Sequence, residues 1–62
     1  MYFKDLKEGD KFKLQGSQKI FTKIKGQLIE DGELGGYVYN ARDDSSGELQ
    51  IIGQYLDVRE ND

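Results

Sequence analysis

The chain has to fold without a disulfide or a metal site built on Cys or His, because its 62 residues include neither cysteine nor histidine. A chain of this length buries only about 60% of the surface that its unfolded form exposes, and disulfides or a structural metal usually supply the missing stability. The absent residue types also exclude zinc sites built on Cys or His, thiol catalysis and any imidazole base. We therefore expect one small domain, residues 1–62, held together by a single apolar core.

Short apolar and charged runs separated by Gly, Ser, Asp and Asn are typical of β-strands joined by turns. Phe3 and Leu6 lie three residues apart, which suits one helical turn that Gly9 would end. The expected strands are residues 11–14, 19–25, 36–41, 49–52 and 54–58, with residues 27–30 as a short third strand or an irregular edge. Turns are expected at residues 16–17, 31–36 and 43–47, and Gly53 indicates a bulge or a sharp bend.

These elements predict an all-β fold: a small, strongly bent antiparallel sheet or an SH3-like barrel of about five strands, with a short N-terminal helical turn. Ile20, Thr22 and Ile24 share one face of the second strand, so Phe21 is exposed unless a bulge near the turn reassigns the faces. The expected core residues are Phe3, Leu6, Phe12, Leu14, Ile20, Ile24, Val38, Ile51, Leu56 and Val58.

Charge is distributed unevenly along the chain, although the net charge is only -3. Residues 1–25 carry seven lysines against three carboxylates, whereas residues 26–62 carry two arginines against nine carboxylates. Such polarity could serve partners of either sign, or could pair the two halves within one small barrel. No apolar run approaches the roughly 20 residues of a membrane span, and no signal-peptide core is found, so a cytoplasmic protein is expected.

No catalytic constellation is found among the polar residues. The serines all lie in expected turns and have no histidine to serve as a base. Asp43, Asp44 and Glu48 share one loop, but their spacing differs from that of an EF-hand, which favours a solvated turn over a cation site. The glycine-rich segment 32–36 lacks the Gly-Lys-Ser/Thr ending of a phosphate-binding loop. We expect no enzyme activity, no cofactor and no metal.

Four short patterns occur in a fixed order along nearly the whole chain: Phe3-x-x-Leu6-x-x-Gly9-Asp10-x-Phe12, Phe21-Thr22-Lys23-Ile24, Tyr39-Asn40-Ala41 and Ser46-Gly47-Glu48-Leu49. The ordered set resembles a group of small phage and prophage proteins, most of which are uncharacterised. The resemblance implies a setting, the cytoplasm of a bacterial host, more than an activity.

The C-terminal half suggests a protein-binding surface. Tyr37, Tyr39 and Tyr55 are amphipathic residues in a chain that can bury few of them, and tyrosine is enriched at interfaces. With Asp43, Asp44 and Glu48 they could occupy a basic groove on a host nucleic-acid enzyme or defence protein, where carboxylates would stand in for phosphates. We expect Tyr37, Tyr39, Asp43, Asp44 and Glu48 as contacts; the alternative is that the tyrosines fill the core with their hydroxyls at its rim.

The N-terminal half suggests a second function, binding of single-stranded nucleic acid. Lys11 and Lys13 on one strand, with Lys23 and Lys25 on its hairpin partner, would form a lysine face on which an exposed Phe21 would stack a base. Lysines on a solvent-exposed strand are also common without any such role.

Self-association is a third alternative. Residues 36–41 and 49–58 predict long strands for so small a domain, and an unpaired edge could pair with its copy in a homodimer. The chain would then be a structural or self-assembling phage component.

Overall fold

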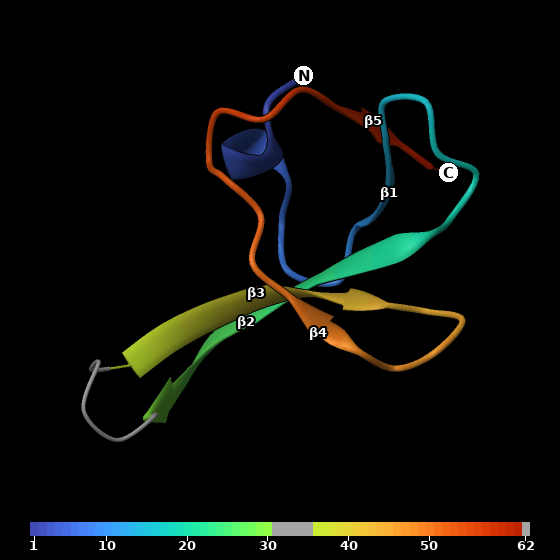
Figure 1. The fold of residues 1–62 in the computed structure, drawn as a ribbon. Coiled ribbons are helices and arrows are strands. Elements are labelled where there is room, and N and C mark those ends of the chain that lie inside the picture. The colour runs from blue at the N-terminus through green and yellow to red at the C-terminus, as the bar shows by residue number, and fades with distance from the viewer. Residues whose placement is uncertain (31–35, 62) are drawn as a thin grey trace.

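Five antiparallel strands in one sheet and a 3-10 turn make up the fold that the computed structural model describes for residues 1–30 and 36–61 (Figure 1). Side chains are described for these residues except 27–30, 36 and 37. The elements are η1 (Phe3–Asp5), β1 (Lys11–Leu14), β2 (Phe21–Glu30), β3 (Gly36–Asp43), β4 (Leu49–Gln50) and β5 (Val58–Glu60). The predicted all-β class, with its N-terminal helical turn, is therefore confirmed.

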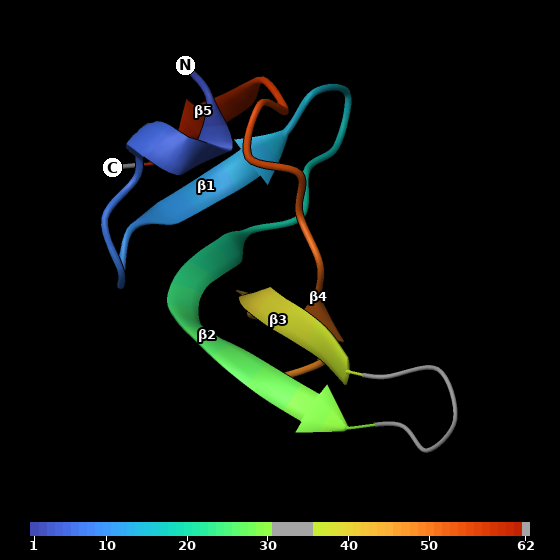
Figure 2. The same ribbon diagram turned by 90° about the vertical axis from the view of Figure 1, so that its left-hand side faces the viewer.

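The sheet is bent and open. Strands β1 to β4 pair in sequence and β5 returns to pair with β1, so β4 and β5 are the two edges and no ladder joins them in the described residues. The long strand β2 curves sharply (Figure 2), and its pairing with β3 changes register between Lys23 and Gln27. Such irregularities bend a strand and increase its twist. Residues 27–30 continue β2 beyond this point and do not form a separate strand.

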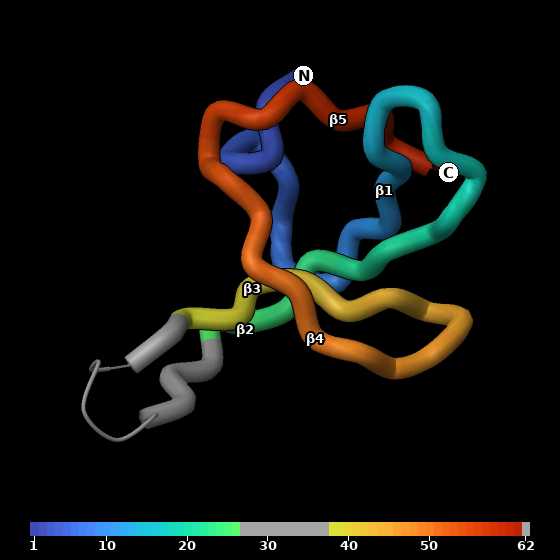
Figure 3. Tube along the Cα trace, viewed as in Figure 1, coloured from blue at the N-terminus to red at the C-terminus, as the bar shows by residue number. Residues whose placement is uncertain are grey.

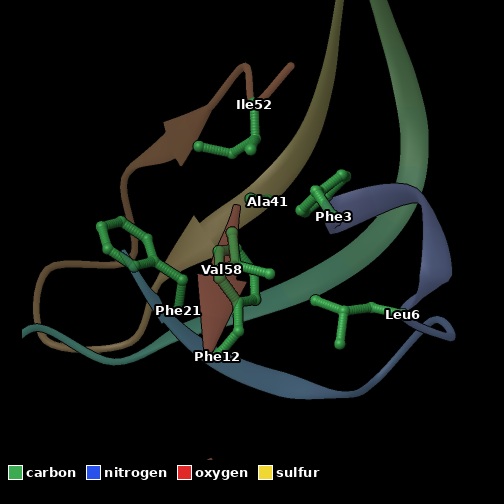
Figure 4. Packing of buried hydrophobic residues seen from close by; sticks show 7 residues of the cluster. All are labelled: Phe3, Leu6, Phe12, Phe21, Ala41, Ile52 and Val58. Atoms are coloured by element: carbon green, nitrogen blue, oxygen red, sulfur yellow. The ribbon is translucent and has the colours of Figure 1, made fainter. Parts of the chain in front are cut away.

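The core contains a row of three phenylalanines. The rings of Phe3 and Phe12 meet edge to face with centroids 5.3 Å apart, and those of Phe12 and Phe21 stack at 5.6 Å. Phe12 of β1 is opposite Phe21 of β2, so the register itself turns Phe21 inward. Figure 4 shows the complete cluster: Phe3, Leu6, Phe12, Phe21, Ala41, Ile52 and Val58.

Part of the expected core is wrong. Phe3, Leu6, Phe12 and Val58 are buried as predicted and Leu14 packs against the cluster, whereas Ile20 and Ile24 are half-buried. Val38, Ile51 and Leu56 are exposed. Their places are taken by Phe21, Ala41 and Ile52. The main reason is that inward and outward faces depend on which residues pair across strands, and a shift of one residue exchanges them.

The segment before β5 differs most from the expected strand 54–58. Residues 53–56 form a turn in which the Leu56 N–H donates to the Gly53 carbonyl, and β5 begins only at Val58. This segment lies beside the N-terminus (Figure 3), where the N–H groups of Phe3 and Lys4 donate to the carbonyls of Leu56 and Gln54. Gly53 therefore marks a turn between strands. Two segments from opposite ends of the chain are thereby joined.

Candidate functional site

Asp43, one of the predicted contacts, is the first residue of the acidic turn, which we define as residues 43–48. It ends β3 and is only 5% exposed. Its Oδ1 accepts hydrogen bonds from the Ser45 hydroxyl at 2.8 Å and the Ser45 N–H at 2.9 Å, and Lys19 Nζ lies 3.9 Å from Oδ2. The hydrogen bonds from Ser45 lower the pKa of Asp43. This carboxylate closes the turn and is not presented to a partner.

The adjacent Asp44 joins the same turn to β1 and β2. Its Oδ2 accepts a hydrogen bond from Lys11 Nζ at 2.6 Å, and its Oδ1 accepts one from Thr22 Oγ1 at 2.6 Å. Arg42 Nη2 lies 3.9 Å from Oδ1. The hydrogen bonds from Lys11 and Thr22 lower the pKa of Asp44. A bridge between a turn and two strands is a structural use of this carboxylate.

The other predicted protein contacts do not form one surface with these carboxylates. Glu48 is exposed. Tyr39 is half-buried and shares the inward face of β3 with Ala41, which is where a tyrosine at the rim of the core would lie. The Tyr37 side chain lies outside the described residues. Within the described parts of the chain, no three acidic side chains gather closely enough to hold a metal ion.

The predicted lysine face is wrong in its geometry. Lys11 is opposite Thr22, so Lys11 and Lys13 lie on the sheet face opposite to that of Phe21 and Lys23. Phe21 is 6% exposed and cannot stack a base. The Lys25 side chain is exposed.

Lys23 has a structural role that the sequence does not suggest. Its Nζ donates hydrogen bonds to the carbonyls of Phe3 at 3.2 Å and Leu6 at 2.7 Å, and it lies 4.6 Å from the centroid of the Phe3 ring. Helix ends leave carbonyl groups without partners, and this ammonium group supplies a donor to the Leu6 carbonyl and a second donor to the Phe3 carbonyl, which also accepts the Leu6 N–H. Two of the four predicted lysines, Lys11 and Lys23, are thus engaged within the fold.

The sequence interpretation missed an exposed pair of aromatic rings, Tyr2 and Tyr55; we define the aromatic patch as this pair with its exposed sequence neighbours Met1 and Leu56. These side chains are 45–73% exposed, with Tyr55 the most exposed at 73%. The rings of Tyr2 and Tyr55 meet edge to face with centroids 5.8 Å apart, and Lys4 Nζ lies 5.3 Å from the Tyr55 centroid. No local pattern in the sequence pairs Tyr55 with Tyr2. Their proximity depends on contacts between the chain ends.

The backbone under the aromatic patch is fixed by hydrogen bonds. Tyr2 forms an antiparallel bridge with Asp57, and the Val58 N–H donates to the Met1 carbonyl at 2.8 Å. The Met1 amino group donates to Asp57 Oδ1 at 2.9 Å, and this hydrogen bond lowers the pKa of Asp57. The two tyrosines are thus carried on segments that already hold each other in place. Binding of a partner to the two tyrosines would therefore cost this chain little backbone conformational entropy.

A hollow of about 390 Å³ adjoins the patch, lined by Met1, Tyr2, Asp5 and Asp57. Carboxylates and an aromatic ring therefore border the same space. Asp57 is already paired with the Met1 amino group at 2.9 Å, so Asp5 and the Tyr2 ring are the groups that a partner's cationic side chain would meet here.

The chain matches no protein-family model, no curated protein and no solved structure. No helix in the described residues is long and apolar enough to cross a membrane.

Proposed function

We propose that this chain is a small non-enzymatic accessory protein that binds another protein through the aromatic patch. One observation carries the proposal: Tyr2 and Tyr55 are 47% and 73% exposed although their rings pack on each other and their backbone is fixed. Exposed apolar side chains that lie together mark interaction sites, and tyrosine is among the residue types that dominate binding energy. The resemblance to small phage proteins supports a host protein as the partner, whose activity would be modulated by occupancy of its surface.

The chemistry of the patch describes the partner's side of the interface. Leu56 and Met1 favour apolar contacts, while the hollow beside Tyr2 contains the carboxylate of Asp5 and that of Asp57, which is paired with the Met1 amino group. A partner surface with an arginine or lysine next to apolar residues would match both: the cation would enter the hollow, and the apolar residues would contact Met1 and Leu56. This surface differs from the predicted acidic one, because Asp43 and Asp44 are engaged within the fold.

The test is affinity capture from bacterial lysate with nuclease-treated and untreated samples, using the parent chain, Tyr55→Ala and Glu48→Ala. Glu48 is exposed but lies outside the aromatic patch, so its variant is the matched control. We expect one protein that survives nuclease treatment, is retained by Glu48→Ala and is lost with Tyr55→Ala. With that partner purified, Tyr55→Ala should weaken binding by roughly tenfold or more.

Two results would contradict the proposal. Equal capture by the parent and by Tyr55→Ala would show that the aromatic patch is not the binding surface. Capture that disappears with nuclease would favour nucleic acid as the partner. Circular dichroism of both variants shows whether a loss of capture reflects a lost contact or a lost fold.

A further inference from the structure

Two positive side chains are directly opposite each other where β1 pairs with β5. The ladder places Lys13 opposite Arg59, on the same face of the sheet. Like charges in this position are destabilising, because their side chains are about 5 Å apart at Cβ. We propose that Lys13 and Arg59 form a binding site for the phosphate group of a small molecule. A dianion bound between the two cations would attract both of them and so offset their mutual repulsion.

The two cations are free of internal partners in the described residues. Neither Lys13 nor Arg59 takes part in any ion pair or side-chain hydrogen bond found there. The neighbouring cation on the same face of β1, Lys11, is neutralised by Asp44 at 2.6 Å. The positive charge at Lys13 and Arg59 is therefore available to a ligand.

A hollow of about 270 Å³ lies at this pair, between the end of the β1–β5 ladder and the loop after β1. Lys13 and Arg59 line it together with Ser17, Gln18 and Asn61, whose side chains supply neutral hydrogen-bond donors. Typical ligand pockets measure roughly 300–1,000 Å³, so this hollow suits a small group. A guanidinium group with its planar pair of N–H donors, beside an ammonium group, is well matched to phosphate oxygens.

Glu60 also lines the hollow, and its carboxylate opposes an anion. Its side chain leaves β5 on the face opposite to Arg59, because successive residues of a strand alternate. The two cations outnumber this single acidic group. The proposal therefore predicts that removal of the Glu60 charge strengthens phosphate binding.

The test is an NMR titration of the isotope-labelled full chain with inorganic phosphate, against sodium chloride of equal ionic strength. We expect phosphate-specific shifts in the amides of residues 13–18 and 59–61, with saturation in the millimolar range or below. Lys13→Gln and Arg59→Gln should each weaken binding by about tenfold, and Glu60→Gln should strengthen it. Lys7→Gln, which removes an exposed lysine outside the hollow, is the matched control and should leave binding unchanged.

A second titration identifies the source of the phosphate. A nucleoside monophosphate should bind at least as tightly as inorganic phosphate, whereas tighter binding of a short single-stranded oligonucleotide would overturn the assignment to a small molecule. Shifts that chloride reproduces, or equal losses in Lys7→Gln and Lys13→Gln, would overturn the site itself. The site shares no residue with the aromatic patch, so Tyr55→Ala should titrate like the parent and the two proposals fail independently.

Discussion

The molecule contains two aromatic clusters of similar local geometry and opposite exposure. In the inner cluster, Phe3 and Phe12 meet edge to face at 5.3 Å and Lys23 Nζ lies 4.6 Å from the Phe3 centroid. In the outer cluster, Tyr2 and Tyr55 meet edge to face at 5.8 Å and Lys4 Nζ lies 5.3 Å from the Tyr55 centroid. Phe3 and Phe12 are both 0% exposed, whereas Tyr55 is 73% exposed.

This difference shows that contact geometry does not reveal what a cluster contributes. Burial of the phenylalanines removes apolar surface from water on folding, and that transfer drives the fold. Tyr55 leaves 73% of its surface in water and Tyr2 leaves 47%, so part of the corresponding free energy is still to be gained when a partner covers them.

The largest expected effect is on stability, from Phe12→Ala. Removal of a fully buried phenylalanine costs about 3–5 kcal/mol, against a total of roughly 3–9 kcal/mol for a domain of this length. Urea denaturation followed by circular dichroism should show a variant that is largely unfolded or has a much lower midpoint. Phe12→Leu, which keeps most of the buried volume, should recover a folded protein and show whether the alanine variant fails for lack of packing.

The matched change in the outer cluster, Tyr55→Ala, should alter the free energy of unfolding by less than about 0.5 kcal/mol, because the ring is mostly in water. The same urea denaturation measures it. A loss as large as that of Phe12→Ala would remove the distinction between the two clusters. It would also place the tyrosines among the structural residues.

The two lysines allow a smaller and cleaner comparison, Lys23→Met against Lys4→Met. The first change keeps the apolar stem but removes the donors to the carbonyls of Phe3 and Leu6. We expect a loss of about 1–3 kcal/mol in the free energy of unfolding. Lys4 is exposed, and Lys4→Met should stay within about 0.5 kcal/mol of the parent. Equal values for the two variants would refute the structural role of Lys23.

Local patterns predict those parts of the fold that local interactions determine. Alternation in residues 11–14 gives the inward face of Phe12, and the positive φ of Gly9 (93°) and Gly47 (76°) explains why glycines stand in the turns that they mark. The acidic turn is also found where it is expected. Each of these features depends on a few consecutive residues.

The remainder depends on pairing between distant segments. Phe21 faces the core because its strand pairs with β1 in the register that places it opposite Phe12. Tyr2 and Tyr55 come into contact because hydrogen bonds join the two ends of the chain. The engagement of Asp44, one of the predicted contacts, depends on distant segments in the same way. Carboxylates in a polar turn look available to a partner, but Asp44 is committed to Lys11 and Thr22, which lie far away in the sequence.

The smallest expected effect is on the pH dependence of stability. It tests whether the carboxylates of the acidic turn stabilise the fold or are free groups on the surface. Hydrogen bonds from Ser45 lower the pKa of Asp43, and hydrogen bonds from Lys11 and Thr22 lower that of Asp44, both from an ordinary value of 3.8. A lowered pKa in the folded state means that the charged carboxylate stabilises folding at every pH above the unfolded value. This stabilisation is lost as the pH falls from about 4 through the lower folded values.

The urea midpoint of the parent should therefore decrease on acidification below about pH 4. The double variant Asp43→Asn, Asp44→Asn should have a lower midpoint at neutral pH and a flatter dependence on pH in the acid range, because its turn has no carboxylate left to protonate. Asp57, whose pKa is also lowered, is present in both proteins and contributes the same slope to each. Glu48→Gln, a change at an exposed residue of the same turn, is the matched control and should follow the parent. If the double variant had the parent's profile, these two carboxylates would be free groups on the surface, and the acidic turn would return as a candidate for the binding site.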